Sequence, residues 1–550
     1  MAFDTVTTEL LVIGSGVAGL RAAVAASEKG VSVLVVSKGP SASPEIMGFN
    51  APVLPEDSVE LYFADMERSG YGINDSRLAW LLSEKVLPEV AWLEANGVHF
   101  ARDREGRCTP IHTLGTKYPR LIRAGFSSGS TEMSALKKLC EAQGVRLDMP
   151  VDILDLLKAG DRVAGAWGMR NGSPVFYRAK AVVLATGGCG AMQSFSTYPS
   201  AIIGDGYAMA YEAGAGLVDM EIQQFEPCCF VWPERIRGKV IATTLLRHGA
   251  ELRNGLGETF MHNYGLSREN AQKGSLSRAM LAEVRAGRGS PHGGIFYDMT
   301  MFDEDFLYKD HAIFTRPARQ AGMDLTKEMP EMMPAAHTNL GGVMIDGACM
   351  SEVEGLFACG EVIGGLHGGN RIGGSAGAET VVFGHLAGDA AAAYVYAASE
   401  TAGQEEAFQE ACRGAERRLA GYLERGGACL AGPIRERLAA SLHDNLGIVR
   451  NADTIRAAEK DLEELRGLLE KSGAAGPEEA ASLIHAEHML TIADMQITAS
   501  GMRKESRGVY YREDYPETDE ENWRCNIVIR RAGRDMTFTT RPAIRDRTFT

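Results

Sequence analysis

The glycine-rich loop at residues 14–19 (GSGVAG) is the feature that most constrains the fold of this 550-residue chain. An apolar run at residues 9–13 precedes the loop, an alanine-rich stretch at 20–29 follows it, and a second apolar run covers 31–36. A strand, a glycine loop, a helix and a second strand within about 30 residues are typical of a dinucleotide-binding unit. Its glycines let the backbone approach a pyrophosphate, which the N–H groups at the start of the helix then bind.

Composition narrows the class of protein. The formal net charge of −15 argues against nucleic acid as the main partner, so any anion-binding site must be a local cationic pocket. The ten cysteines are scattered without a Cys-x-x-Cys pair, which predicts no metal or iron–sulfur site and indicates a reducing compartment. Because residues 1–10 lack a basic segment and no apolar run reaches ~18 residues, we expect a cytoplasmic protein without direct membrane insertion. Peripheral attachment to a membrane complex stays open.

Later segments return to the nucleotide-binding domain. Residues 181–188 (AVVLATGG) and 356–361 (LFACGE) are predicted short strands that end in small residues. Residues 207–213 and 375–398 are predicted helices that begin after glycines. The second strand ends in Ser37-Lys38, without the acidic residue that usually holds an adenosine ribose, which argues against a plain nicotinamide site.

Seven ordered sequence blocks resemble the flavoprotein family of succinate dehydrogenase, fumarate reductase and L-aspartate oxidase. The resemblance covers nearly all of the chain, and seven blocks at the family spacing are far more specific than any one of them. It implies FAD as the cofactor and a flavin-dependent oxidoreductase that acts on a C–C bond. The blocks are residues 14–38, 185–188 (ATGG), 204–206 (GDG), 337–342 (HTNLGG), 360–361 (GE), 367–375 (HGGNRIGGS) and 505–516 (ESRGVYYREDYP).

The architecture implied by this resemblance is α/β. We expect a Rossmann-like FAD-binding domain with an inserted α+β capping domain, followed by a helical domain and a β-rich C-terminal tail. Three or four helices are predicted in the amphipathic, charge-laced region that follows a polar spacer at 399–405. The expected boundaries are 1–224 and 346–400 for the two parts of the FAD-binding domain, 225–345 for the cap, 401–505 for the helical domain and 506–550 for the tail.

The resemblance also assigns flavin contacts residue by residue. Many members bind the flavin covalently through a histidine near the second strand, but Ser41 stands at that place and no histidine occurs between Ser37 and Asn50. We therefore expect non-covalent FAD. The cofactor-binding residues implied by the resemblance are Gly14, Ser15, Gly16, Ala18, Gly19, Ser37, Lys38, Thr186, Gly187, Asp205, Glu361, Arg371 and Ser375.

Three residues match the family's catalytic positions. Hydride transfer between flavin N5 and a carbon beside a carboxylate needs a held carboxylate, a well-placed carbon and a proton donor. His337 and Arg371 match the residues that clamp a substrate carboxylate, and the planar fork of arginine suits bidentate binding. Arg247 matches the arginine that transfers the proton, so we expect it to serve as proton donor and acceptor.

The chain departs from the family pattern around this proton donor. Where members read Arg-Gly-Glu-Gly-Gly, residues 247–251 read RHGAE, so the glutamate that relays protons is missing. The relay arginine of the family appears here as Lys273. His248, Glu251 and Lys273 are the candidates to take over the relay, and the sequence does not choose among them.

The far end of the substrate site also differs. The family's His-Pro-Thr-Gly, which binds a second carboxylate, reads EPCC at residues 226–229, and its Thr-Glu pair reads Thr243-Thr244. An ionised Glu226 would repel a second carboxylate. We therefore expect a substrate with one carboxylate and a neutral, cationic or bulkier group at its other end. Three nearby aromatic residues would suit such a group: Phe225, Phe230 and Trp232.

Other functions stay open from the sequence alone. A succinate or fumarate enzyme proper would use the same clamp, an L-aspartate oxidase-like enzyme would place an amine beside Glu226, and a non-catalytic electron-transfer protein would bind FAD alone. The resemblance implies a partner that is an iron–sulfur or other electron-transfer subunit, because the chain has no cluster ligands of its own. The sequence does not identify that partner, the physiological direction or the oligomeric state.

The first testable prediction concerns the flavin linkage. Acid precipitation of the purified protein should release all of the yellow colour into the supernatant, because Ser41 replaces the histidine that would form the covalent bond. Absorbance spectra of pellet and supernatant measure the result. A flavin that stays with the pellet would refute non-covalent binding.

Overall fold

A five-stranded parallel sheet forms the centre of the molecule. The computed structural model describes the chain except for residues 1–2, 114, 126, 269–270, 399–402 and 550. Four of the five strands are buried along their whole length, which explains why they read as continuous apolar runs. In sheet order the strands are β17 (Leu356–Ala358), β10 (Ala181–Leu184), β2 (Leu10–Ile13), β3 (Val33–Val36) and β6 (Arg146–Asp148).

Helix α1 (Val17–Glu28) lies between α8 (Ser375–Ala397) and α4 (Ser128–Ala142). Helix α8 can pack closely against α1 only because residue 388 is glycine, since a Cβ there would lie 2.3 Å from the carbonyl oxygen of Ala22. The sequence pattern had predicted the first helix from residue 20. The structure begins it at Val17, because the last residues of the glycine loop already form its first turn.

A second, antiparallel-rich sheet and several smaller elements surround this core. The sequence did not anticipate this sheet, whose strands alternate only weakly between buried and exposed residues. Its order is β1 (Asp4–Thr7), β9 (Ser173–Arg178), β8 (Arg162–Arg170) and β7 (Val151–Ala159). The smaller elements are β4 (Phe49–Asn50), α2 (Val59–Ser69), α3 (Ser76–Ala95), β5 (Leu121–Ile122) and α5 (Asp205–Ala213).

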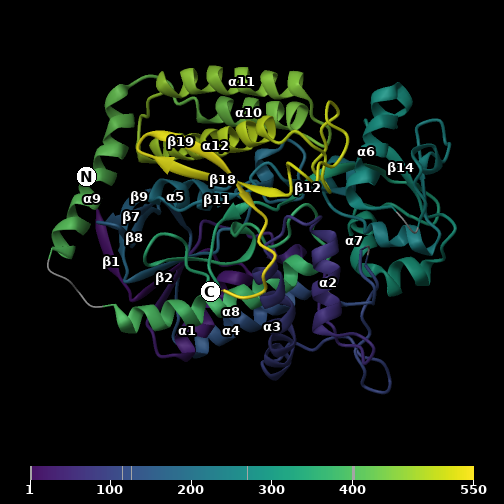
Figure 1. The fold of residues 1–550 in the computed structure, drawn as a ribbon, viewed down its shortest axis with the longest axis horizontal. Coiled ribbons are helices and arrows are strands. Elements are labelled where there is room, and N and C mark those ends of the chain that lie inside the picture. The colour runs from purple at the N-terminus through teal and green to yellow at the C-terminus, as the bar shows by residue number, and fades with distance from the viewer. Residues whose placement is uncertain (1–2, 114, 126, 269–270, 399–402, 550) are drawn as a thin grey trace.

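The inserted segment forms its own sheet and core, drawn in teal on the right of Figure 1. Phe230, Met280 and Tyr297 are among the fully buried residues of this core. We keep the segment boundaries at 224/225 and 345/346 as proposals. The strands, in sheet order, are β12 (Gln223–Trp232), β15 (Glu331–Asn339), β14 (Ile295–Asp298) and β13 (Glu251–Arg253), and the helices are α6 (Lys273–Glu283) and α7 (Ala312–Gln320).

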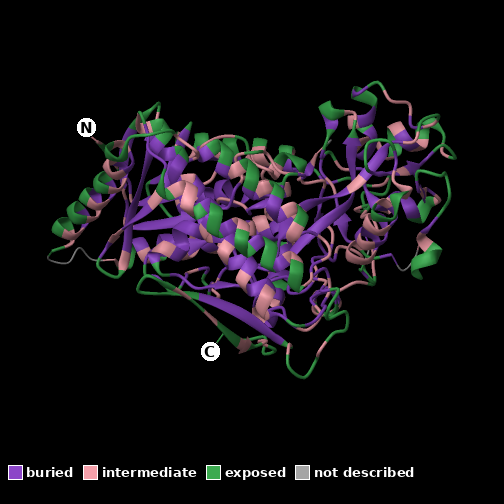
Figure 2. Ribbon diagram, turned by 90° about the horizontal axis from the view of Figure 1, so that it is seen from above, coloured by how far each residue is buried: buried purple, intermediate pink, exposed green. Residues whose placement is uncertain are grey.

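The C-terminal region contributes four helices among the described residues and then a hairpin. Figure 1 shows α10, α11 and α12 side by side along the top, and Figure 2 shows buried strands with exposed residues on the outer faces of helices. The proposed boundary at 400/401 lies outside the described residues. The helices are α9 (Gln404–Arg425), α10 (Ala431–Asn445), α11 (Ala452–Glu470) and α12 (Pro477–Met502), and the hairpin is β18 (Cys525–Ala532) with β19 (Asp535–Pro542).

The hairpin returns the end of the chain to the nucleotide-binding core. Strand β18 pairs with β11 (Leu217–Val218), which also pairs with β16 (Gly342–Val343). The predicted fold class is confirmed: an α/β core with an inserted α+β segment, a helical region and a β-rich tail. No helix in the described part of the chain is both long and apolar enough to cross a membrane.

A buried arginine joins the C-terminal region to this core. Arg503 is fully buried and donates hydrogen bonds to Glu221 (2.7 Å) and Glu505 (3.0 Å), and its Nη2 lies 3.5 Å from an oxygen of Asp219. Burial, followed by repulsion from Glu221, raises the pKa of Asp219 to about 7. Asp219 and Glu221 therefore depend on the guanidinium of Arg503 and on their other hydrogen bonds, whereas Glu505 also pairs with Arg507.

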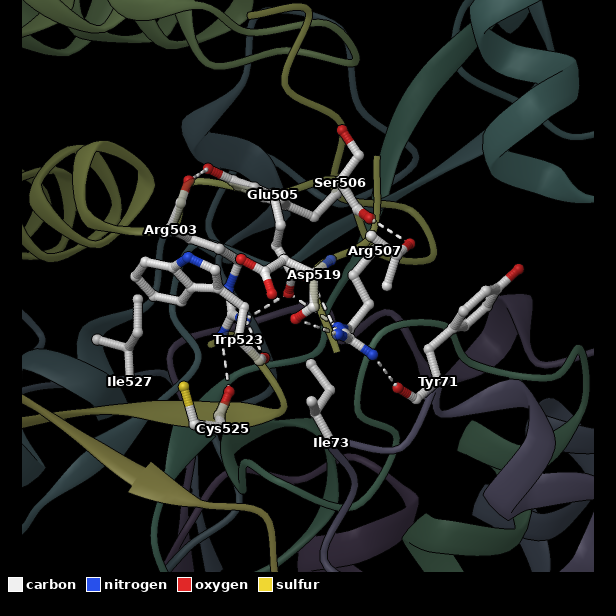
Figure 3. Close-up of polar contacts among 12 residues, drawn as sticks. Tyr71, Ile73, Arg503, Glu505, Ser506, Arg507, Asp519, Trp523, Cys525 and Ile527 are labelled. Atoms are coloured by element: carbon white, nitrogen blue, oxygen red, sulfur yellow. Dashed lines mark hydrogen bonds and ion pairs between the residues drawn. The ribbon is translucent and has the colours of Figure 1, made fainter. Parts of the chain in front are cut away.

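Arg507 extends this cluster toward the start of α3. Figure 3 shows Arg507 between Glu505 and the backbone of Tyr71. Its guanidinium donates to Glu505 at 2.8 Å and to the Tyr71 carbonyl oxygen at 2.7 Å. The side chain of Tyr71 in turn reaches the inserted segment, where its hydroxyl donates to Gln272 Oε1 at 2.7 Å.

Replacing Arg503 by methionine should lower the free energy of unfolding by about 3–5 kcal/mol, because buried carboxylates lose their cation. The matched control is Arg530→Met, which breaks an exposed ion pair with Glu352 and should cost about 0–1 kcal/mol. Urea unfolding followed by circular dichroism compares the two variants. Equal losses for both would contradict the role given to Arg503.

Candidate functional site

The glycine loop has the backbone geometry of a dinucleotide-binding turn. Gly14 has φ +119°, and a Cβ there would lie 2.1 Å from the Ala185 carbonyl oxygen. A Cβ at Gly19 would lie 2.0 Å from the Gly14 carbonyl oxygen, so α1 can pack this close to β2 only because residue 19 is glycine. The loop therefore presents backbone atoms, without intervening side chains, at the carboxyl end of β2.

A cavity of about 990 Å³ begins at this loop and extends to the inserted segment. It brings together parts of the chain that are far apart in the sequence. Most of the residues predicted for cofactor and substrate line it: Gly14, Ser15, Gly16, Ala18, Ser37, Lys38, Thr186, Gly187, Asp205, Glu226, Thr243, Thr244, His337, Glu361 and Arg371.

Two of the predicted cofactor residues lie just behind the cavity wall. Gly19 packs against Gly14, as described above. Ser375 is buried at the start of α8, where its hydroxyl accepts a hydrogen bond from Asn50 at 3.2 Å and lies 3.1 Å from the Tyr62 hydroxyl. Both residues support the wall and are not exposed to the cavity.

Arg247 is not where the sequence pattern had led us to expect it. It lies in the short 3₁₀ segment Thr243–His248, whose buried face carries Leu245 and Leu246. Arg247 and His248 turn outward and are exposed, and Arg247 does not line the cavity. The structure therefore does not bring Arg247 to the cavity, and its role as proton donor stays a prediction.

Lys273 lies close to His337 and Arg371. This lysine is the first residue of α6, and its ammonium forms a buried ion pair with Glu226 of β12. His337 of β15 has its Nε2 4.0 Å from Glu226 Oε2 and its Nδ1 3.0 Å from the Thr197 hydroxyl. Glu226, Lys273, His337 and Arg371 all line the same cavity.

Burial and like charge set the ionisation of these groups. Burial lowers the pKa of Lys273, Glu226 opposes this shift, and the guanidinium of Arg371 adds to it. Burial also holds the pKa of His337 well below its usual range, and the cations of Lys273 and Arg371 act in the same direction. His337 is therefore a neutral imidazole at neutral pH.

Arg371 is a buried cation whose hydrogen bonds are largely unused. Its side chain is 5% exposed, and its Nε has no hydrogen-bond partner among the described residues. A guanidinium nitrogen lies 3.5 Å from the Ile372 carbonyl oxygen, which is a long hydrogen bond. A buried guanidinium in this state favours an anionic ligand with two oxygens.

Glu361 lies close to Gly188 and lines the same cavity as Arg371 and the glycine loop. Its carboxyl accepts hydrogen bonds from the Tyr198 hydroxyl and from the backbone N–H of Asn339. Burial raises the pKa of Glu361 to about 7, with Tyr198 opposing the shift. The group is a hydrogen-bonding side chain whose charge is near its midpoint at neutral pH.

The cavity fits FAD. The glycine loop and the N-terminus of α1 form the expected place for a pyrophosphate. The buried hydroxyl of Thr186 has no hydrogen-bond partner among the described residues, and neither does Arg371 Nε. The cavity wall therefore has polar atoms that a bound ligand could hydrogen-bond. Ser41, the residue expected at the position of the family's covalent histidine, also lines the cavity.

Sequence reasoning missed parts of the site. Lys273 was only one of three candidates for a relay, and Tyr198, Thr197 and the histidines of α12 were not singled out. The aromatic residues expected at the far end are elsewhere: Phe225 and Phe230 are buried in strand β12 and Trp232 is 46% exposed, stacked on His292. Apolar residues of other segments take that place in the cavity wall: Ile236, Val240, Ile313, Phe314 and Pro317.

Comparison with protein families gives two matches that together cover most of the chain. The model described as "FAD binding domain" matches residues 9–376, and the model described as "Fumarate reductase flavoprotein C-term" matches residues 435–548. The first match alone spans more than half of the sequence.

Individual relatives agree with these models over nearly their full length. A fumarate reductase (CoM/CoB) subunit of Methanothermobacter marburgensis is 34% identical, over 95% of this chain and 97% of its own. The L-aspartate oxidase of Streptomyces coelicolor is 30% identical, over 96% of this chain and 92% of its own. A mutant of E. coli quinol fumarate reductase superposes with a TM-score of 0.91 at 26% identity, covering 99% of this chain and 98% of that one.

Proposed function

Because this chain belongs to the fumarate reductase, succinate dehydrogenase and L-aspartate oxidase flavoprotein family, and is an FAD-dependent oxidoreductase, we propose that it acts on a C–C bond beside the single carboxylate of its substrate. In the direction of reduction, a C=C bond conjugated to the carboxylate gains one hydride and one proton and becomes a C–C single bond. The reduced form of the bound flavin would supply the hydride and be left oxidised.

The observation that carries this proposal is the charge balance at the reacting end of the cavity. Among Glu226, Lys273, His337 and Arg371, the lysine and the glutamate neutralise each other and His337 is neutral. These four residues therefore carry one net positive charge, that of Arg371. One substrate carboxylate neutralises this charge. A second carboxylate would find no further cation among these four residues and would have to pair with a cation elsewhere on the cavity wall, where Arg235, Lys239 and Arg316 lie.

We propose that Arg371 binds the carboxylate and His337 donates a hydrogen bond beside it. As the hydride adds to the β-carbon, negative charge develops on the α-carbon and the carboxylate, and the guanidinium of Arg371 stabilises that charge. The apolar wall formed by Ile236, Val240 and Phe314 would accommodate the uncharged end of the substrate.

Lys273 is proposed as the proton donor in place of Arg247. Its ammonium gives a proton to the α-carbon, and the resulting amine recovers a proton from solvent. A lysine whose pKa is lowered by burial is a better matched acid at neutral pH than an arginine, which stays protonated in proteins. Glu226 would keep the ammonium charged and directed into the cavity between turnovers.

The electron donor or acceptor is proposed to be a separate protein with an iron–sulfur cluster. Two relatives are named as subunits of larger enzymes: the fumarate reductase (CoM/CoB) relative and the 8-methylmenaquinol:fumarate reductase flavoprotein of Wolinella succinogenes. The chain itself carries no Cys-x-x-Cys pair that would suit a cluster.

Fumarate is the second candidate substrate, and the names of the relatives favour it. Its second carboxylate would need a cation. If Lys273 supplied it, the buried carboxylate of Glu226 would lose its partner. The two candidates therefore differ in whether the Lys273–Glu226 pair stays intact.

Lys273→Met should slow reoxidation of the reduced flavin by an unsaturated acid by roughly 10²–10⁴-fold while FAD stays bound, because the proton donor is lost. Lys273→Arg should retain part of the activity and move the alkaline limit of the pH–rate profile upward, since the wild-type rate falls as Lys273 loses its lowered-pKa proton. Anaerobic stopped-flow absorbance measures both.

The matched control for this prediction is Lys239→Met. Lys239 also lines the cavity, but it is 48% exposed and pairs with Glu45 at 2.5 Å. Its replacement should leave the rate within about twofold. A wild-type rate in Lys273→Met would remove Lys273 from the chemistry.

A further inference from the structure

A buried cluster of charged and imidazole groups lies at the opposite end of the cavity. Asp205, the first residue of α5, forms an ion pair with Lys38, which follows β3. The other oxygen of the Asp205 carboxylate is 2.8 Å from His485 Nδ1 and 3.1 Å from His488 Nδ1. Both histidines belong to α12, which is 280 residues further along the chain.

His485 also reaches a second carboxylate. Its Nε2 lies 2.6 Å from Asp152 Oδ2 on β7. The ring therefore bridges two acidic groups from two different elements, and both ring nitrogens are used. Although burial opposes protonation, Asp205 and Asp152 raise the pKa of His485 to about 9, so the imidazole is cationic at neutral pH.

Asp205 supplies a carboxylate that is missing from the end of the second strand of the dinucleotide-binding unit. A dinucleotide-binding unit usually has an acidic residue at the end of its second strand, where the carboxylate accepts a hydrogen bond from a ribose hydroxyl. Strand β3 ends at Val36, and Ser37 and Lys38 follow it, with no such residue. The fold brings a carboxylate to this place from α5, because Asp205 pairs with Lys38 and both line the cavity.

We propose that His485 and His488 are positioning residues for the cofactor: they hold Asp205 in place at the adenosine end of the FAD site, so that α12 completes this site from the C-terminal region. The proposal rests on FAD binding and is independent of the substrate. Neither histidine lines the cavity, so both act through Asp205.

The contribution of His485 to cofactor binding depends on pH, because the charge of the cluster changes when the imidazole loses its proton. His485 and Lys38 are two cations against the carboxylates of Asp152 and Asp205, and His485 and Lys38 hold the pKa of Asp205 well below its usual range. When His485 loses its proton, the two carboxylates face only Lys38, and an anionic cofactor is bound less well. The contribution of His485 is therefore present below about pH 9 and is lost as the pH rises through that value.

Other charged groups around α12 are already paired. Arg418 of α9 pairs with Asp155 of β7 at 2.5 Å and with Glu487 of α12 at 2.9 Å. His488 is 1% exposed and uses Nδ1 on Asp205. These groups keep their partners when His485 titrates.

The experiment measures the dissociation constant of FAD for the apoprotein, by quenching of flavin fluorescence, across about pH 7 to 10. His485→Gln should weaken binding about tenfold near neutral pH, the size of one lost charge-assisted hydrogen bond. The ratio of the variant to the wild-type constant should then fall toward one as the pH passes about 9. Taking the ratio cancels the titration of FAD itself.

A matched control is His385→Gln. His385 lies between Glu89 (2.5 Å) and Asp389 (3.4 Å) in the same kind of arrangement, but it does not line the cavity or contact Asp205. This substitution should leave FAD affinity within about twofold at every pH. A second variant, Asp152→Asn, removes one neighbour of His485 and should move the midpoint of the wild-type pH dependence to lower pH.

Three results would overturn the proposal. The first is a His485→Gln ratio that stays constant across the pH range, because a merely structural role would give it. The second is a midpoint unmoved in Asp152→Asn. The third is stoichiometric Zn²⁺ in the purified holoprotein that disappears in His485→Gln, since the ligand atoms of Asp205, His485 and His488 lie within 4.8 Å of one another.

Discussion

The ion pair between Lys273 and Glu226 is the interaction on which the substrate site depends. It joins the first residue of α6 to β12 and lies beside His337 and Arg371. Because each charge is buried, neither residue tolerates the loss of the other without a new partner. The pair also leaves Arg371 as the cation that a ligand must neutralise. The chemistry proposed here, with one carboxylate bound and one proton given by Lys273, follows from this arrangement of charge.

Both ends of the cavity are completed by segments that are distant in the sequence. At the reacting end, Tyr71 is held through its backbone by Arg507 and reaches Gln272, the residue before Lys273. At the other end, His485 holds Asp205. The C-terminal region therefore supports both the cofactor end and the substrate end, although none of its described residues lines the cavity. Buried, hydrogen-bonded charges give such contacts a defined geometry, because an unpaired alternative is costly.

The sequence predicts local units well and long-range placement poorly. The β2–α1–β3 unit follows from adjacent residues, because the glycines and apolar runs are contiguous. The antiparallel sheet of β7 to β9 was missed because both of its faces are largely buried, which removes the alternation expected of a strand. The exposure of Arg247 was not foreseen, because sequence does not show which face of the segment Thr243–His248 is buried. The location of Lys273 depends on how the inserted sheet packs against the loop before α8. No local sequence pattern predicts that packing.

The most direct test of a single-carboxylate substrate is the anaerobic reoxidation of the reduced protein. Visible flavin absorbance is followed while matched concentrations of fumarate and of mono-carboxylate enoates, from crotonate to cinnamate, are added in turn. At least one of the enoates should reoxidise the flavin faster than fumarate, because a single carboxylate balances the charge of Arg371 beside the Lys273–Glu226 pair. Faster reoxidation by fumarate than by every enoate would contradict this account of the site.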